Sequence, residues 1–296
     1  MVAAGEEYKK TLGCRIERIG NADTEKACSE LASLVAHANE AQVKKAAPFL
    51  LSVAQYLTGL GIVADAKKIP LELRCADGEA VKLEVVPVKD PGGAKMIPGY
   101  DASKNPPLYL NKPGSPYWTE YLPDKDTIYF QYDKCVDSPK EPFAEFQAGL
   151  EKLIGDHPSA RLAIDLRENG GGSSPILDPF IDWLKGSKQA NQRGKLFVIV
   201  GRRTFSSAIL NALRLRNETQ AIFAGEPTGG SANHYGQVET FTLPNSRFSV
   251  SYSTKHFKYS DKDEPTMTPD ILVELTSQDY FSGKDPVLEA IFNYKQ

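Results

Sequence analysis

The second half of this chain alternates short apolar segments with amphipathic ones, and this alternation restricts the possible fold more than any other feature. The apolar segments have the length of strands, and the segments between them place apolar residues at helical spacing. Strands that are apolar along most of their length and separated by helices are typical of a mainly parallel sheet covered on both faces. The sequence therefore predicts an α/β domain. Its strands are expected at residues 127–135, 161–166, 195–200 and 221–224, and its helices at residues 141–154, 175–184 and 206–215.

A smaller α+β module is predicted before this domain. Residues 14–20 alternate apolar and charged side chains as a half-buried strand does, and Asp23 with Thr24 offers the cap of a following helix. Residues 69–88 predict a hairpin of two alternating strands. A second hairpin, predicted at residues 238–254, belongs to the α/β domain.

A long segment dense in proline and glycine separates the two regions. Residues 89–117 show neither helical nor strand periodicity, which is typical of a linker. The predicted organisation is therefore a module over residues 1–88, a linker over residues 89–117 and an α/β domain over residues 118–296.

Charge and hydropathy exclude some classes of partner. The chain has 35 Lys and Arg against 38 Asp and Glu, a net charge of −3, and so no basic footprint for nucleic acid or an anionic membrane. The most apolar stretch, residues 46–66, is interrupted by Pro48, Gly59 and Gly61. It predicts a buried helix and turn rather than a membrane span. The first residues lack the basic and apolar pattern of a signal peptide.

The four cysteines give no indication of metal or disulfide chemistry. Cys14, Cys28, Cys75 and Cys135 lie far apart in the sequence and form no CxxC pair. The sequence therefore predicts neither a zinc site nor a disulfide framework, and reduced, buried thiols are expected.

Two loops follow the carboxyl ends of predicted strands, which is where open α/β sheets bind their ligands. The first, "DLRENGGGSS" (165–174), has three consecutive glycines, which let the backbone approach a ligand and direct N–H groups at an anion. It lacks the GxGxxG and GK[ST] patterns of nucleotide-binding loops. The second, "GRRTFSSA" (201–208), places Ser206 and Ser207 between a strand and a helix. Ser206 is therefore either a helix N-cap, worth about 1 kcal/mol, or a nucleophile beside an oxyanion-binding glycine loop.

Three segments together resemble motifs of the tail-specific, or C-terminal-processing, serine peptidases, and in particular of their tricorn-like branch. They are "IDLRENGGG" (164–172), "TFSSA" (204–208) and "GEPTGG" (225–230), and "PDILVE" (269–274) matches as well. Each motif alone is weak, and the combination is specific. The resemblance covers most of the chain. It implies that the first module is a PDZ-like peptide-binding module and that the α/β domain is a crotonase-type catalytic domain.

The resemblance also implies roles for individual residues. Ser206 matches the nucleophile, because Thr204 stands two positions before it and small residues follow it. Ser207 would give its backbone N–H to the oxyanion, together with Gly171 from the glycine run. The resemblance implies no metal and no cofactor.

The general base has no clear counterpart. In the lysine-dependent branch of the family the base occupies the position of Ser231. In the tricorn-like branch it is a histidine from upstream of the PDZ-like module, supported by an acidic residue before the "PD" motif, and Asp263 and Glu264 fit that acidic position. No histidine precedes the module here, so we expect an N-terminally truncated form and predict weak or absent peptidase activity of residues 1–296. His234, in the site segment, is either a substitute base or a hydrogen-bonded structural residue.

The function that the resemblance implies is a serine endopeptidase that hydrolyses unstructured polypeptides through an acyl-enzyme on Ser206. The PDZ-like module would bind an extended peptide along a strand edge and present it. The resemblance is to bacterial proteins, exported in a longer form.

Two other functions fit parts of the sequence. A catalytically silent relative that binds a peptide or another ligand would have the same pocket without a base. A crotonase-type enzyme would use the glycine loop for a thioester oxyanion, which leaves "TFSSA" and "GEPTGG" unexplained. A fluorophosphonate probe, which reacts with an activated serine, separates the peptidase from the binding protein.

Overall fold

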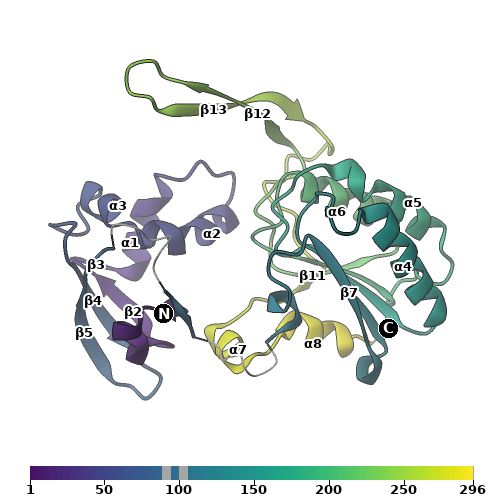
Figure 1. The fold of residues 1–296 in the computed structure, drawn as a ribbon, viewed down its shortest axis with the longest axis horizontal. Coiled ribbons are helices and arrows are strands. Elements are labelled where there is room, and N and C mark those ends of the chain that lie inside the picture. Colours follow the sequence, from purple (N-terminus) through teal and green to yellow (C-terminus); the bar gives the residue numbers. More distant parts are fainter. Residues whose placement is uncertain (89–94, 100–105, 296) are drawn as a thin grey trace. The chain divides into compact units, whose positions relative to one another are not determined.

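The computed structural model describes residues 1–88, 95–99 and 106–295, which form two compact units (Figure 1). Unit 1 contains Met1–Asn111 and Leu275–Asp285, and unit 2 contains Lys112–Glu274 and Pro286–Gln296. Much of the predicted linker lies outside the described residues. The sequence did not predict that residues 275–285, which follow most of unit 2 in the chain, belong to unit 1.

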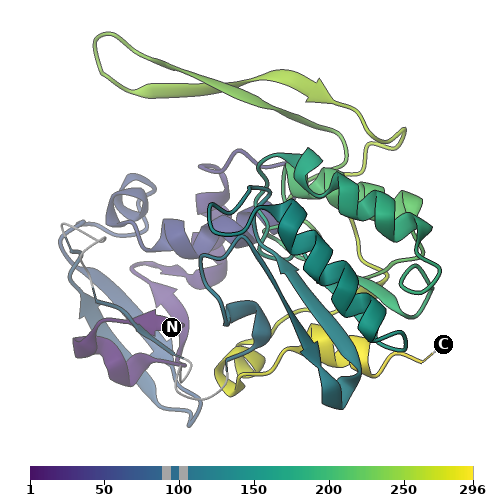
Figure 2. The same cartoon turned by 45° about the vertical axis from the view of Figure 1, so that its right-hand side comes forward.

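Unit 2 is built on a six-stranded sheet in the order β14-β11-β10-β9-β8-β7 (Figure 2). Only β7 and β8 pair antiparallel in it, and the other neighbours are parallel. The predicted mainly parallel sheet is therefore confirmed, with β10 inside it and parallel to β9. The edge strand β7 was not predicted. The strands are β7 (Tyr117–Leu122), β8 (Thr127–Tyr132), β9 (Arg161–Asp165), β10 (Leu196–Val200), β11 (Ile222–Gly225) and β14 (Ile271–Leu272).

The inner strands of this sheet are largely apolar, and both of their faces are covered. Every residue of β8 and of β10 is buried. The helix α4 (Phe143–Asp156) buries Phe146, Leu150 and Ile154, whose spacing places them on one face. These side chains share one core with residues of β8, β9 and β10. The other helices of the unit are α5 (Asp178–Gly186), α6 (Ser207–Glu218) and α8 (Pro286–Phe292), with 3-10 turns η4 (Pro123–Lys125) and η5 (Ser174–Ile176).

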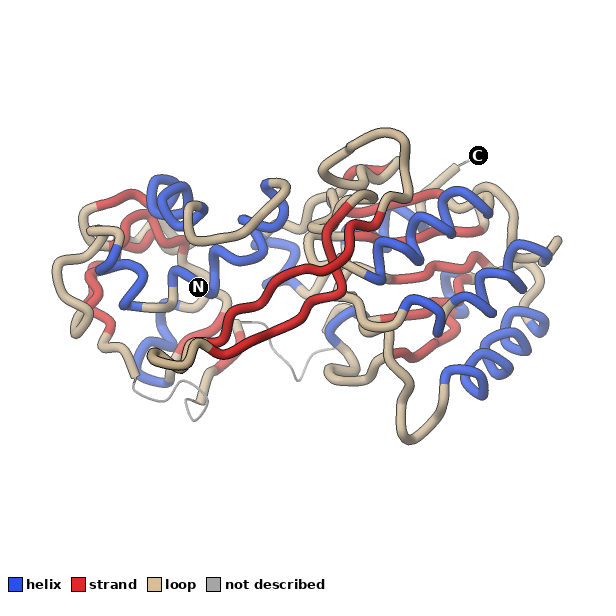
Figure 3. The backbone as a smooth tube through the Cα atoms, turned by 90° about the horizontal axis from the view of Figure 1, so that it is seen from above, coloured by secondary structure: helices blue, strands red, loops and turns tan. Residues whose placement is uncertain are grey.

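A two-stranded antiparallel ribbon, β12 (His234–Thr242) and β13 (Ser249–Phe257), completes unit 2 and confirms the hairpin predicted at residues 238–254 (Figure 3). Nearly all of its residues are exposed, and it pairs with no other described strand. None of the described helices is long and apolar enough to cross a membrane.

Unit 1 has a four-stranded antiparallel sheet in the order β3-β2-β4-β5. The Asp23 side chain accepts a hydrogen bond from the Lys26 N–H, as predicted for the cap of the first helix. That the unit is PDZ-like stays a prediction. Its strands are β1 (Ala3–Ala4), β2 (Arg15–Ile19), β3 (Ala22–Asp23), β4 (Ile69–Arg74), β5 (Ala80–Val85) and β6 (Ile97–Pro98), and its helices are η1 (Glu6–Thr11), α1 (Thr24–Ala32), α2 (Glu40–Leu51), α3 (Ala54–Gly59), η3 (Leu108–Leu110) and α7 (Ser277–Ser282).

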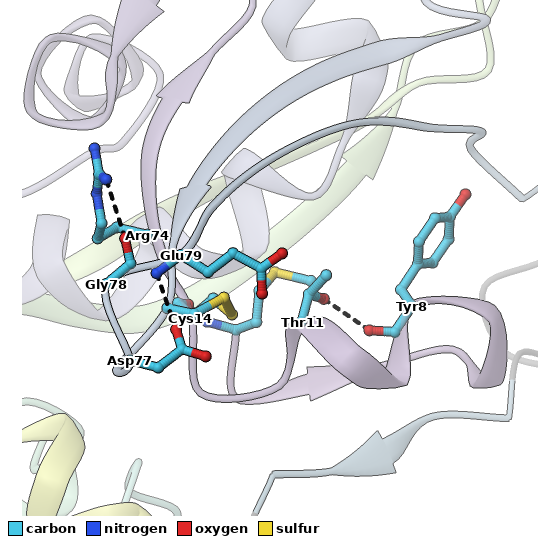
Figure 4. Close-up of a disulfide and its surroundings, with 9 residues drawn as sticks. Tyr8, Thr11, Cys14, Arg74, Asp77, Gly78 and Glu79 are labelled. Atoms are coloured by element: carbon cyan, nitrogen blue, oxygen red, sulfur yellow. Dashed lines mark hydrogen bonds between the residues drawn. A yellow bond between two sulfur atoms is a disulfide. The ribbon is translucent and has the colours of Figure 1, made fainter.

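The expectation that all cysteines are reduced was wrong. Cys14 and Cys75 form a disulfide within unit 1 (Figure 4). Cys14 precedes β2 and Cys75 follows β4, and the adjacent residues Arg15 and Arg74 are paired in the sheet. The pairing of β2 with β4 therefore brings together two cysteines that are 61 residues apart, with their Cα atoms 4.0 Å from each other.

We expect the replacement of Cys75 by serine to destabilise unit 1 by about 2 to 5 kcal/mol, because the disulfide removes loop-closure entropy from the unfolded chain. Thermal unfolding with and without a reducing agent measures this effect. Reductant should lower the unfolding temperature of the wild type toward that of Cys75→Ser. Cys28→Ser, which removes a free thiol of the same unit, should leave that response intact. A Cys28→Ser protein that has lost its sensitivity to reductant would contradict the assignment.

Candidate active site

Ser206 occupies a sharp turn between β10 and α6. Its backbone has φ of 52° and ψ of −125°. A positive φ is uncommon for a residue with a Cβ, and such conformations cost of order 1–3 kcal/mol each. The Ser206 side chain makes no capping bond to α6, and its Oγ has no hydrogen-bond partner among the described residues. The simple N-cap alternative therefore fails, and a strained strand-to-helix turn that presents a free hydroxyl is an arrangement suited to a nucleophile.

The turn that carries Ser206 is fixed to the preceding loop of the sheet. Thr204 is fully buried, and its Oγ1 donates to Leu166 O at 2.8 Å and accepts from Gly201 N at 3.0 Å. The Phe205 N–H donates to the backbone oxygen of Asn169 at 3.1 Å. These bonds place the two predicted loops side by side at the carboxyl ends of β9 and β10.

Two ion pairs reinforce the same loops, and the sequence analysis did not identify them. Arg202 binds Glu226 with two bonds, at 2.8 and 2.9 Å, and so joins the Ser206 turn to the "GEPTGG" segment. Arg203 binds Glu168 at 3.0 Å and joins the turn to the residues just before the glycine loop, which we define as residues 170–172. The sequence shows these charged residues within the motifs. Which of them pair becomes apparent only once the strand order is known.

The glycine loop lies directly against the Ser206 turn. A Cβ placed on Gly171 would lie 2.9 Å from Ser206 Cβ and 3.2 Å from Ser207 N. Gly171 also has a φ of +111°, which side-chain-bearing residues rarely adopt. The structure therefore brings together Gly171, Ser206 and Ser207, and glycine is needed at position 171 for both conformation and space.

The backbone donors near Ser206 differ in their availability. The Ser207 N–H has no acceptor among the described residues, whereas its Oγ donates to Gly172 O at 2.6 Å. The Gly171 N–H donates to the buried side chain of Asn169 at 2.9 Å. That Gly171 donates to an oxyanion stays a prediction, and in this arrangement its N–H is already engaged. The N–H groups of Gly170 and Gly172 have no acceptor among the described residues.

The "GEPTGG" segment forms a further side of the site. Gly230 N donates to Thr204 O at 3.0 Å, and a Cβ on Gly230 would lie 3.2 Å from Phe205 Cα. The next residue, Ser231, is buried, and its Oγ donates to Asn233 O. The position that holds the base in the lysine-dependent branch is therefore close to the Ser206 turn, but it carries a hydroxyl that is already bonded.

Two other candidate residues, His234 and Asp263, lie at or near the start of β12 in the same unit. His234 Nδ1 is 2.9 Å from Ser231 O, and its ring stacks on Phe257. Asp263 Oδ1 is 3.5 Å from Asn233 Nδ2, so this carboxylate lies near the start of β12. No hydrogen bond joins any of these groups to Ser206 Oγ in the described part of the chain.

Glu264 lies within reach of the charge of Arg216 in α6. Burial lowers the pKa of Arg216, and the nearby charges of Asp270 and Glu264 raise it. That Asp263 or Glu264 supports the site stays a prediction.

A carboxylate cluster lies at the carboxyl ends of β8 and β9. Asp165 is almost fully buried and binds Arg167 at 2.8 Å and Tyr129 OH at 2.7 Å. Burial raises the pKa of Asp133 to about 7, and the nearby charges of Asp165 and Glu168 raise it further against hydrogen bonds from Gln131 and the charge of Arg167. No group of three or more His, Cys, Asp or Glu in the described ranges is placed to hold a metal ion.

The raised pKa of Asp133 predicts a pH-dependent stability. The native state holds this proton up to about pH 7, and the unfolded state loses it near pH 4. The contribution of Asp133 to the free energy of unfolding is therefore most favourable below pH 4, and it decreases as the pH rises from 4 to 7. Asp133→Asn should unfold at a higher denaturant concentration than wild type at pH 8, and the difference should vanish near pH 4. Asp124→Asn, at an exposed carboxylate, serves as the control, and an unchanged pH profile of Asp133→Asn would contradict the prediction.

Comparison with known proteins adds the fold family. No family model matches the sequence, and no curated protein matches it. Mature CPAF in complex with lactacystin matches with a TM-score of 0.58 at 15% identity, over 95% of this chain and 78% of that chain. The photosystem II D1 C-terminal processing protease (15% identity, TM-score 0.40, 76% of this chain and 59% of that one) and the tricorn protease (16%, 0.41, 77% and 22%) match less well.

The resemblance inferred from the sequence motifs is confirmed at the level of the fold by the likeness to mature CPAF. The sequence identities are low, so the likeness to CPAF concerns the fold. The chain therefore shares its mixed α/β fold, with its mainly parallel six-stranded sheet, with mature CPAF.

Proposed function

We propose that this chain is a serine peptidase that cleaves unstructured polypeptides with Ser206 as nucleophile. The observation that carries the proposal is the Ser206 turn: a strained backbone, a hydroxyl without a partner among the described residues, and a free Ser207 N–H beside it. The glycine loop packs against this turn and needs glycine at position 171. The shared fold with CPAF, whose complex with lactacystin is known, supports the same reaction class.

The proposed reaction is acyl transfer. Ser206 Oγ attacks the carbonyl carbon of a peptide bond and gives its proton to a general base, and the carbonyl oxygen becomes an oxyanion. The Ser207 N–H and a donor from the glycine loop stabilise this charge, and one such donor is typically worth about 10² to 10³ in rate. The C–N bond then breaks, the amine leaves with the proton, and water hydrolyses the acyl-enzyme.

His234 is the candidate base that we propose within the described residues. A backbone carbonyl can only accept, so Nδ1 carries the proton in its bond to Ser231 O, which leaves Nε2 as the basic nitrogen. Asp263 would support the charge of the imidazolium. Because no contact joins His234 to Ser206, we expect slow cleavage.

Unit 1 is proposed to bind the substrate as a PDZ-like module. Its sheet ends in the strand β5, whose residues are exposed or half-buried in alternation. An extended peptide could add to such an edge through main-chain hydrogen bonds, and side-chain pockets would be needed only for specificity.

The test combines a fluorophosphonate probe with an unfolded protein substrate. Labelling of one serine, together with slow cleavage of the substrate, supports the peptidase. If His234→Ala removes the cleavage, His234 is the base, and if cleavage survives, the base lies elsewhere. A protein that binds unfolded substrate but is neither labelled nor active is the alternative, a catalytically silent binding protein, which the unpaired Ser206 hydroxyl also permits.

A further inference from the structure

A cluster of buried polar side chains lies beneath the glycine loop. Asn169, Asn211 and Cys135 are each 0% exposed. Cys135 Sγ lies 3.5 Å from the side-chain oxygens of both asparagines. Burying an amide is unfavourable unless its polar atoms are bonded, so the positions of these side chains are set by their partners.

Asn169 joins three elements of the site. Its Oδ1 accepts from Gly171 N at 2.9 Å, and its Nδ2 donates to Tyr132 O at the end of β8 at 2.7 Å. Its backbone oxygen accepts from Phe205 N, the residue before Ser206, at 3.1 Å. One residue thus connects the end of β8, the glycine loop and the Ser206 turn.

Asn211 occupies the same cluster but has different partners. Its Nδ2 donates to Ser174 O at 2.9 Å, beyond the glycine loop, and its Oδ1 lies 3.5 Å from Cys135 Sγ. It is equally buried and of the same type, and among the described residues its side chain makes no hydrogen bond to Gly171 or to the Ser206 turn. Asn211 is therefore a matched control for Asn169.

We propose that Asn169 is a positioning residue that sets the distance and orientation of the glycine loop relative to Ser206. The proposal rests on the proposed function of Ser206 as nucleophile. With its N–H held by Asn169, Gly171 lies so close to Ser206 and Ser207 that a Cβ on it would be 2.9 Å from Ser206 Cβ, and this close approach shapes the space proposed for the carbonyl oxygen. The donors left to that space are the Ser207 N–H and the unpaired N–H groups of Gly170 and Gly172.

Without the Asn169 amide, the glycine loop would no longer be held in one conformation beside Ser206. Gly171 and Gly172 both adopt positive φ, and a glycine run has many alternative conformations when no side chain restrains it. A shift of about 1 Å in such a group can cost about 10²-fold in rate. The effect should appear in the rate of the chemical step and not in substrate binding.

The experiment compares Asn169→Ala with Asn211→Ala in the full chain. Both remove a buried amide and should lower the unfolding temperature to a similar extent. The rate of labelling by a fluorophosphonate should fall at least tenfold in Asn169→Ala and less than threefold in Asn211→Ala, consistent with the rate cost of a misplaced group. Hydrogen exchange should accelerate in peptides covering residues 166–172 and 201–206 of Asn169→Ala only. In substrate cleavage, kcat should fall while KM stays unchanged.

Two results would overturn the proposal. The first is Asn169→Ala labelled as fast as wild type, and the second is an equal loss in both variants, which would show a merely structural role. If the wild type itself is not labelled, the proposed function fails. Hydrogen exchange alone then tests whether Asn169 positions the glycine loop. Faster local exchange in Asn169→Ala than in Asn211→Ala then supports it, and equal exchange in the two variants overturns it.

Discussion

Replacing Ser206 by alanine is expected to abolish both labelling by a fluorophosphonate and hydrolysis of an unfolded polypeptide. The reaction requires an oxygen nucleophile, and Ser206 Oγ is the hydroxyl that the strained turn presents without a hydrogen-bond partner among the described residues. Removing the nucleophile of a serine peptidase typically costs about 10⁶ in kcat, so residual cleavage should fall below detection. Intact mass spectrometry after incubation with the probe gives the direct measurement.

Ser207→Ala is the matched control for this experiment. The Ser207 side chain donates to Gly172 O at 2.6 Å. The proposed contribution of Ser207 to the reaction comes from its backbone N–H, which alanine retains. Loss of one such hydrogen bond costs about 1 kcal/mol, so we expect at most about a tenfold slower labelling. Labelling that survives in Ser206→Ala but disappears in Ser207→Ala would assign the nucleophile to the neighbouring serine.

The central sheet could be predicted from the sequence because its strands are buried on both faces. Such strands appear as continuous apolar segments, and β9 and β10 lie where these segments predict them. The edge strand β7 was missed, since it begins where a segment rich in proline and glycine ends and carries no such signature. Edge strands meet solvent on one side, and their sequences are correspondingly less restricted.

The disulfide could not be predicted because it depends on strand order in unit 1. Cys14 and Cys75 are distant in the sequence, and only the pairing of β2 with β4 brings them together. Spacing rules detect metal ligands that are close in the sequence, and they do not detect contacts made by sheet register. The same limit applies to the return of residues 275–285 to unit 1.

The sequence predicted which loops form the candidate site, but it did not predict the hydrogen bonds between them. Parallel strands bring their carboxyl ends to one edge, so the loops that hold Gly171 and Ser206 were expected to meet there. The role of Asn169 was missed, although it stands directly before the glycine run. A polar residue at that position signals a turn, but which N–H its side chain accepts depends on backbone angles that the sequence does not give.

Replacing Gly171 by alanine is expected to have the second-largest effect. The new Cβ would lie 2.9 Å from Ser206 Cβ and 3.2 Å from Ser207 N, inside the space proposed for the carbonyl oxygen. The backbone at this position has φ of +111°, so the loop must also move to accommodate a side chain. A displaced loop would misplace the N–H groups proposed for the oxyanion, and losing one such donor typically costs about 10² to 10³ in rate, so we expect labelling by the fluorophosphonate to slow by about that factor.

Gly170→Ala tests whether this effect comes from crowding at Ser206 rather than from any loss of glycine in the loop. A Cβ on Gly170 would meet nothing within 4 Å, and its φ is not in the region that excludes side chains. Gly170→Ala should therefore be labelled at nearly the wild-type rate, with an unfolding temperature close to that of the wild type. If Gly170→Ala and Gly171→Ala slow labelling equally, the loss reflects stiffening of the whole loop. If neither variant slows it, the carbonyl oxygen does not occupy the space between Gly171 and Ser207, and the oxyanion must be stabilised elsewhere around Ser206.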